Sequence, residues 1–221
     1  MNNQQLRSGR LLLIVVVLFF SSCSHKQQHA QSSAPSDFSS KLEAHRAGVD
    51  SVMRFAPDSP FNRDTSVAYH GLNYFPPNPE FRFECILHRY PIPTPTAVMG
   101  TKGEIRSEVK YGYFEFTYQG ERYRLNVYKM SDEELRRHGD ELKDYLMVWF
   151  TDSTTGKETY PVGRYVDVDR ESSDPNHLYT LDFNYAYNPY CAYSANYSCA
   201  VPTRDNTLPF PVYAGEKKYH N

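Results

Sequence analysis

The segment at residues 111–128, YGYFEFTYQGERYRLNVY, constrains the fold most, because its hydrophobic residues alternate on both sides of a turn. Phe114 and Phe116 alternate before Gln119 and Gly120, and Leu125 belongs to the alternating arm that follows. Successive side chains of a strand point to opposite faces, so the pattern predicts a β-hairpin with one buried face. The polar residues of the second arm are expected to face water: Arg122, Arg124 and Asn126.

Further strands and two helices are predicted around this hairpin. Helical spacing predicts a helix over residues 37–55 with Asp37 as its cap, and a capping box, Ser131-x-x-Glu134, opens a short helix over residues 131–145. Residues 56–65 are proline-punctuated and predict a loop. The fold class is therefore mainly β: an antiparallel, barrel- or sandwich-like single domain with an N-terminal helix and one short inserted helix. Strands are expected at residues 81–87, 147–150, 164–168 and 179–184, with a proline-containing edge strand at 206–213.

The N-terminus has the pattern of an export signal. Arg7 and Arg10 precede the apolar run LLLIVVVLFF at residues 11–20, which is shorter than the roughly 20 residues of a membrane-spanning helix. Phe20-Ser21-Ser22-Cys23 resembles a bacterial lipobox, which implies cleavage before Cys23 and lipid attached to its sulfur. An ordinary secretory signal is the alternative. We expect a signal peptide at 1–22, a flexible lipid tether at 23–37 and one domain at 38–221, anchored by lipid and facing the periplasm.

Charge and cysteine content limit the partners. The formal net charge is −2 and no segment is strongly basic, so we expect no nucleic-acid partner. With Cys23 lipidated, Cys85, Cys191 and Cys199 remain, and an oxidising compartment permits one disulfide. Cys85 lies in a predicted buried strand and is expected to be an inert free thiol. We expect no metal and no cofactor.

Two stretches are more polar than a scaffold requires. The first, FTDSTTGKETYPVGRY at residues 150–165, contains Glu158, Tyr160 and Arg164. Glu158 and Arg164 either pair with each other or face a ligand together, and an arginine suits a carboxylate or phosphate. The alternative is a hairpin loop with an exposed ion pair, which contributes little to stability.

The second stretch, DFNYAYNPYCAYSANYSC at residues 182–199, is rich in tyrosine, asparagine and cysteine. Its tyrosines either fill the rim between sheet and water or wall a pocket in which asparagines supply hydrogen bonds. Four alternatives are open for Cys191 and Cys199: a disulfide, unpaired thiols, a metal site or a catalytic nucleophile. The spacing of the two cysteines is too wide for a zinc knuckle. The predicted ligand-binding residues of both stretches and the tail are Glu158, Tyr160, Arg164, Asp182, Asn184, Tyr187, Asn188, Cys191 and Asn206. Tyr190 is expected to line the same rim.

These stretches, together with GLNYFPPNPEFRF, LNVYKM and DNTLPFPVYAGEK, resemble the bacterial and archaeal proteins grouped as domain of unknown function 1684. The resemblance runs from about residue 42 to residue 217. It implies a shared fold and a shared site, and it implies no activity. The positions that match the family's motif residues are Asp152, Gly156, Glu158, Thr159, Tyr160, Gly163, Arg164, Asp182, Asn184, Asn188, Pro189, Cys191, Cys199, Asn206 and Glu216.

The sequence supports three functional hypotheses. The first is a lipid-anchored envelope protein that binds a small polar ligand at a rim lined by tyrosine, asparagine and arginine. The second is a hydrolase that uses Cys191 or a carboxylate such as Asp182, which requires a histidine or a second carboxylate within hydrogen-bond reach. The third is a structural scaffold of the envelope.

Overall fold

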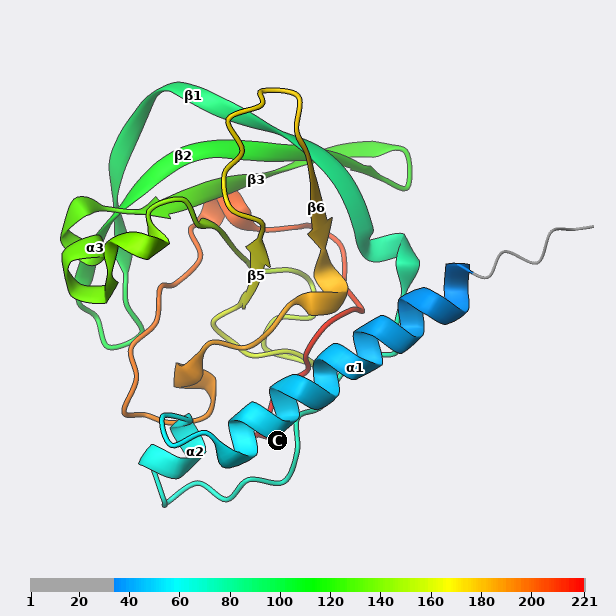
Figure 1. Cartoon of the computed structure of the whole chain (residues 1–221), viewed down its shortest axis with the longest axis vertical. Helices are drawn as coiled ribbons and strands as arrows, with labels where there is room; N and C mark the ends of the chain where they lie inside the picture. The colour runs from blue at the N-terminus through cyan, green and yellow to red at the C-terminus, as the bar shows by residue number, and fades with distance from the viewer. Residues whose placement is uncertain (1–33, 221) are drawn as a thin grey trace, which may run out of the picture. The chain divides into compact units, whose positions relative to one another are not determined.

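Six antiparallel strands form the sheet of this protein, in the order β5-β4-β3-β2-β1-β6 (Figure 1). The computed structural model describes residues 34–220, with side chains from Asp37 onward. The edge strands β5 and β6 approach each other, so the sheet is a nearly closed barrel, and the predicted fold class is confirmed. The strands are β1 (Arg82–Met99), β2 (Ile105–Tyr118), β3 (Glu121–Met130), β4 (Leu146–Phe150), β5 (Arg164–Val168) and β6 (Leu178–Asp182).

The predicted hairpin is confirmed as the antiparallel pair β2–β3. Tyr118 pairs with Glu121, so the turn has two residues. Gln119 and Gly120 both have positive φ, 51° and 84°, as a primed two-residue turn requires. β1 is longer than predicted and extends through three prolines, with an irregularity in its pairing to β2 between Arg89 and Thr94.

One side of the hairpin differs from the prediction, because the C-terminal chain covers it. Asn126 was expected in water, yet it is 7% exposed. The buried Asn206 amide donates to the carbonyls of Asn126 (3.0 Å) and Trp149 (2.8 Å), and its oxygen accepts from the Asn126 N–H (2.8 Å). Since β3 and β4 share one paired position, Tyr128 with Met147, this amide continues the ladder between them. The edge strand predicted at residues 206–213 is wrong: the chain there makes an isolated bridge, Thr151 with Thr207.

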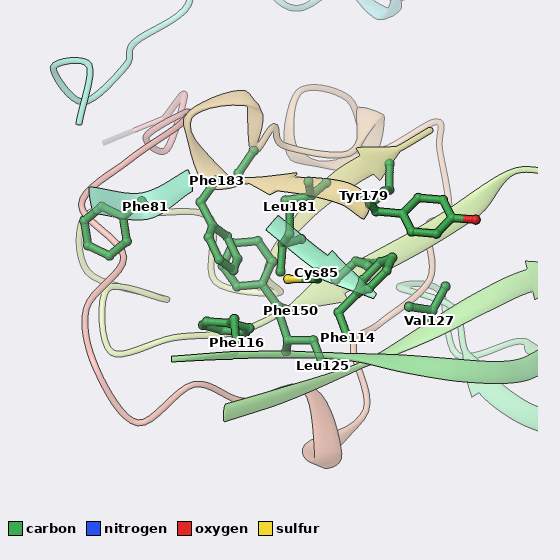
Figure 2. Close-up of a cluster of buried hydrophobic side chains, with 14 of the residues drawn as sticks. Phe81, Cys85, Phe114, Phe116, Leu125, Val127, Phe150, Tyr179, Leu181 and Phe183 are labelled. Atoms are coloured by element: carbon green, nitrogen blue, oxygen red, sulfur yellow. The ribbon is translucent and has the colours of Figure 1, made fainter. Parts of the chain in front are cut away.

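The core lies inside the curved sheet and is rich in aromatic rings (Figure 2). Phe114, Leu125 and Phe183 are fully buried. The first two come from the paired strands β2 and β3, and Phe183 comes from the turn that follows β6. Cys85 lies among these side chains at 2% exposure, and burial raises the pKa of its thiol to about 12. Cys85 is a free thiol, as predicted, and its protonated state and burial make it unreactive.

Two helices precede the sheet and one interrupts it. α1 (Ala34–Phe55) begins before Asp37, which lies in the first turn and pairs with Lys41. A short helix, α2 (Pro60–Arg63), occupies the predicted loop. α3 (Asp132–His138) begins at the predicted Ser131 cap, but it is shorter than predicted, because Gly139 adopts φ 115° and ends it. Short 3₁₀ turns are η1 (Pro79–Phe81), η2 (Asp140–Leu142), η3 (Phe183–Tyr185), η4 (Tyr190–Ala192) and η5 (Arg204–Asn206).

The predicted signal peptide, Cys23 and most of the tether lie outside the described residues. Among the helices that the structure does describe, none combines the length and apolar character that a membrane crossing requires.

A buried arginine connects the start of β5 to the turn after β4 and to the last segment of the chain. The Arg164 side chain is 1% exposed and donates to the Asp152 carboxylate at 2.7 Å. The same guanidinium donates to the carbonyls of Val212 (2.9 Å), Ala214 (2.5 Å) and Glu216 (3.2 Å). A buried charge requires a counter-ion and hydrogen-bond partners. Arg164 has Asp152 as its counter-ion, and its hydrogen bonds to the three carbonyls hold residues 212–216 against the barrel.

Replacing Arg164 should therefore destabilise the whole domain. Arg164→Ala leaves the Asp152 carboxylate and three carbonyls buried without their donor, and we expect the free energy of unfolding to fall by about 3–5 kcal/mol. Urea unfolding followed by the fluorescence of Trp149, the single tryptophan, measures this change. Lys41→Ala breaks an exposed ion pair and is the control, with an expected loss below about 1 kcal/mol. Equal losses in both variants would contradict the assignment.

Stability should also fall as pH rises, because Glu108 is buried on β2. Glu108 is 5% exposed, and its Oε2 atom is buried with no hydrogen-bond partner among the described residues. Burial, with a smaller contribution from nearby Glu134, raises the pKa of Glu108 from 4.5 to about 7. The folded state therefore holds this proton more tightly than the unfolded state. The stabilisation is complete below pH 4.5 and is lost as pH rises to about 7.

Glu108→Gln removes this proton linkage. Between about pH 5 and about pH 8, the free energy of unfolding should fall less in the variant than in the parent, by up to about 3 kcal/mol. Urea titrations at several pH values measure the two slopes, and Glu43→Gln on the exposed face of α1 is the control. An unchanged slope in Glu108→Gln would show that Glu108 does not hold a proton in the folded state.

Candidate functional site

A pocket of about 920 Å³ lies between α1 and the tyrosine-rich segment that follows β6. Figure 1 shows α1 running diagonally past the end of the barrel, with the C-terminal chain beside it. The pocket is thus formed by parts of the chain more than a hundred residues apart. Its lining residues are Ala44, His45, Arg46, Gly48, Val49, Val52, Met53, Tyr74, Tyr165, Asp167, Asn184, Tyr185, Ala186, Tyr187, Pro189, Tyr190, Tyr197, Cys199 and Glu216.

Tyrosine rings form one wall of this pocket. Tyr165 and Tyr187 share an antiparallel backbone bridge, and their ring centroids lie 5.9 Å apart at near-perpendicular angles. Tyr190 and Tyr197 make a similar edge-to-face pair at 5.2 Å. Such contacts fix the rings in place and add about 0.5–1.5 kcal/mol each beyond burial. The wall is therefore a set of mutually supported aromatic faces.

Helix α1 supplies the opposite wall and two basic groups. The His45 ring packs edge-on against Tyr185, with centroids 4.7 Å apart. The Arg46 guanidinium lies 4.5 Å from the Tyr74 ring centroid and donates to the carbonyls of Phe75 (2.9 Å) and Asn184 (3.4 Å). The Arg46 Nε is buried and has no hydrogen-bond partner among the described residues. Arg46 thus fastens α1 to the tyrosine-rich segment.

Glu216 contributes a buried carboxyl group to the lining. It is 1% exposed and accepts hydrogen bonds from the Tyr193 hydroxyl (2.6 Å), the Asn188 amide side chain (2.9 Å) and the Asn188 backbone N–H (3.0 Å). Burial outweighs these donors and raises the pKa of Glu216 to about 7. The group can therefore accept or donate a hydrogen bond near neutral pH.

One thiol, Cys199, lines the same pocket, and Cys191 lies beside it. The Cys199 Sγ accepts a hydrogen bond from the Cys191 backbone N–H at 3.3 Å. The Tyr160 hydroxyl lies 3.6 Å from the Cys191 Sγ. Both cysteines are free thiols in this structure, and the disulfide stays a prediction. Hydrogen bonds from Cys199 above all, and then from Tyr160 and Thr101, lower the pKa of the Cys191 thiol to about 6.

The structure brings several predicted site residues together. Tyr187, Tyr190 and Asn184 line the pocket, as does Glu216 of the matched motif. Tyr160 and Cys191 contact each other beside Cys199. Asn184 has little capacity left for a ligand, because its side chain already bonds the Asn78 backbone at both ends.

The other predicted site residues do not line this pocket, and most of them have structural partners. Arg164 pairs with Asp152 in the interior, while Glu158 is exposed on the surface, so the predicted Glu158–Arg164 pair does not form. Both polar atoms of the Asn206 side chain bond backbone groups of β3 and β4. Asp182 caps the turn η3 by accepting a hydrogen bond from the Asn184 N–H. Asn184 lies in that turn and not in the strand predicted over residues 179–184. Asn188 is fully buried against Glu216.

The DSTTG turn has a structural role as well. One oxygen of Asp152 accepts from the Thr154 N–H (2.6 Å) and hydroxyl (2.5 Å), and the other accepts from Arg164. Gly163 adopts φ 118°, and a Cβ there would lie 2.6 Å from the Phe150 carbonyl, which explains the glycine before Arg164.

Sequence reasoning missed the contribution of α1. His45, Arg46, Gly48 and Tyr74 line the pocket, yet nothing in their spacing distinguishes them from an ordinary surface helix and loop. Arg46 was detectable in one respect: it interrupts the apolar side of the helix near Leu42 and Val49.

The hydrolase hypothesis lacks its base in this geometry. Within residues 37–220, no histidine and no carboxylate hydrogen-bonds the Cys191 thiol. Asp182 is bonded by Asn184 and lies 3.6 Å from Arg82, again without a second carboxylate or a histidine among its described partners. General acid–base catalysis requires such a partner within reach.

Comparison with known proteins agrees with the resemblance that the motifs indicated. The family model described as "Protein of unknown function (DUF1684)" matches residues 67–217. The solution NMR structure of an uncharacterized protein from Haloarcula marismortui is similar, with 32% identity and a TM-score of 0.59 over 83% of this chain and 96% of that chain. A search among curated proteins gave no match. The chain belongs to the DUF1684 family.

Proposed function

We propose that this protein is a lipid-anchored envelope protein that binds a small ligand in the pocket between α1 and the tyrosine-rich segment. The observation that carries the proposal is the pocket itself, with a wall of supported tyrosine rings on one side and a helix on the other. Small-ligand sites are commonly concave, mostly apolar and aromatic, with a few fixed polar groups. The pocket's volume falls within the usual range for such sites, roughly 300–1,000 Å³.

The lining favours a ligand with a flat or ring-shaped body and a polar end. Tyrosine faces stack on sugars and heterocycles, and the apolar side of α1, with Val49 and Val52, covers the opposite face. Glu216 contributes a carboxyl group and Arg46 contributes a guanidinium to the lining. The polar groups differ from those first expected, since Glu216 and Arg46 replace Glu158 and Arg164.

The envelope location rests on the N-terminal sequence. The apolar run and the Ser-Ser-Cys motif support lipid attachment at Cys23, and ten residues lie between Cys23 and the first residue of α1, Ala34. That spacing would hold the pocket within a few nanometres of the membrane, because an extended chain spans at most about 3.6 Å per residue.

Filling the pocket should abolish binding. Gly48 lines the pocket from α1, and a Cβ built there meets no atom within 4 Å. Gly48→Phe therefore places a ring in the ligand space, and it removes a residue that weakens helices by about 1 kcal/mol relative to Ala. With the fluorescent probe 8-anilinonaphthalene-1-sulfonate, whose fused rings and anionic group suit the tyrosines and Arg46, we expect the variant to bind at least about tenfold more weakly, a loss of about 1.4 kcal/mol.

Ala47→Phe is the matched control for this experiment. Ala47 adjoins Gly48 on α1, is exposed and does not line the pocket. Its probe affinity should equal that of the parent protein. Equal affinities in all three proteins, or no saturable binding by the parent, would sink the proposal.

Lipid anchoring has its own test. In cells that express the full chain, Cys23→Ser should move the protein from the detergent-soluble membrane fraction to the aqueous fraction, because several acyl chains are needed for stable anchoring. Cys85→Ser is the control, since this thiol is buried in the barrel. Cys23→Ser that stays with the membrane would show that lipid on this cysteine is not the anchor.

A further inference from the structure

Cys191 and Cys199 form a pair whose two sulfurs differ in environment. Cys191 lies in the turn η4, and its backbone N–H points at the Cys199 Sγ, 3.3 Å away. Both residues are partly exposed, whereas Cys85 is buried among aromatic rings. Cys199 lines the ligand pocket and Cys191 is itself partly exposed, so a small molecule in solution can reach this pair.

The surroundings of Cys191 favour its thiolate. The Tyr160 hydroxyl lies 3.6 Å from the Cys191 Sγ and also contacts the Cys191 carbonyl at 3.3 Å. Thr101 is held beside the pair, because its backbone N–H donates to the Cys199 carbonyl (3.0 Å) and its hydroxyl accepts from the Cys199 N–H (3.2 Å). A hydroxyl donor at the Cys191 sulfur stabilises negative charge on it, in agreement with the lowered pKa of Cys191.

The Cys199 thiol has the opposite bias. The hydrogen bond that it donates to Cys191, followed by burial, raises its pKa. The lowered pKa of Cys191 and the raised pKa of Cys199 favour the shared proton on Cys199 and the charge on Cys191. This asymmetry assigns the two sulfurs different roles in an exchange reaction.

We propose that Cys191 and Cys199 are a reactive dithiol site that exchanges with small organic disulfides, with Cys191 as the nucleophile and Cys199 as the resolving thiol. The Cys191 thiolate attacks one sulfur of a disulfide R–S–S–R, forming the Cys191–S–S–R bond and releasing R–S⁻, which takes up a proton. Cys191 then no longer carries charge, so the main cause that keeps Cys199 protonated is gone.

The second step closes the cycle. Cys199 loses its proton and attacks the Cys191 sulfur, forming the Cys191–Cys199 bond and releasing the second R–S⁻. In total, two protein thiols are oxidised by two electrons, and one small disulfide is reduced to two thiols. Thiol–disulfide exchange proceeds through such a mixed disulfide, at rates that depend on the thiolate fraction of the attacking sulfur. The inference goes beyond ligand binding, and it does not depend on the proposed ligand.

The test uses the full chain with Cys23→Ser, in which Cys85 is the remaining thiol besides the pair. The reduced protein is incubated with bis(2-hydroxyethyl) disulfide and its intact mass is measured. We expect a loss of two hydrogens without an adduct. Adding Cys199→Ser should instead trap one mixed disulfide, and peptide mapping should locate it at Cys191. Cys191→Ser should trap an adduct at least about tenfold more slowly, because burial still raises the pKa of Cys199 and keeps its thiol mostly protonated near neutral pH.

Tyr160→Phe tests the assigned donor without removing either thiol. The rate of Cys191 alkylation by iodoacetamide should have a midpoint near pH 6 in the parent. The midpoint should move upward in Tyr160→Phe, while the rates above about pH 9 converge, since the thiolate is then fully formed in both. A purely structural tyrosine would leave the midpoint unchanged. The proposal is overturned if Cys199→Ser forms no adduct, or if Cys191 alkylates with the midpoint of an ordinary thiol, about 8.5.

Discussion

A guanidinium in the interior of a barrel must have an acceptor for its charge and for its N–H groups, and this requirement fixes the path of the C-terminal chain. Arg164 takes Asp152 as counter-ion and bonds the carbonyls of Val212, Ala214 and Glu216. Once those carbonyls are in place, the Glu216 side chain must lie at the pocket, where Asn188 bonds its carboxyl group. One buried charge thus positions both the closing segment of the barrel and the polar group of the candidate site.

The same principle explains why so many polar motif residues are structural. Asn206 supplies the amide that the short β3–β4 pairing lacks, and Asn184 does the same for the backbone of Asn78. A loop that crosses the end of a barrel carries backbone groups that no strand satisfies, and side-chain amides are suited to bond them. The asparagines and the aspartate of these motifs therefore mainly hydrogen-bond the backbone of irregular segments. The tyrosines between them line the pocket.

The fold was predictable where local patterns decide it. The β2–β3 hairpin, β5 and the Ser131 helix start follow from alternation, apolar runs and capping, which act over a few residues. The site was predictable in part. The tyrosine-rich segment was identified, but the prediction that Arg164 contacts a ligand was wrong. A guanidinium group that can bind a carboxylate ligand can bind the Asp152 carboxylate and backbone carbonyls equally well. The opposite wall, with Arg46 and Gly48, could not be predicted, since its role arises from packing across more than a hundred residues.

We propose that a ligand binds in the pocket between α1 and the tyrosine-rich segment and not at the loop containing Glu158. The direct measurement is an amide NMR titration of the full chain carrying Cys23→Ser with a set of small aromatic heterocycles and monosaccharides, followed residue by residue. The account predicts that a binding compound shifts the signals of residues around the pocket, such as Gly48, Tyr74 and Tyr187, and leaves the turn at Gly156 and Glu158 unchanged. Shifts confined to that turn, or no residue-specific shifts around the pocket with any compound, would contradict it.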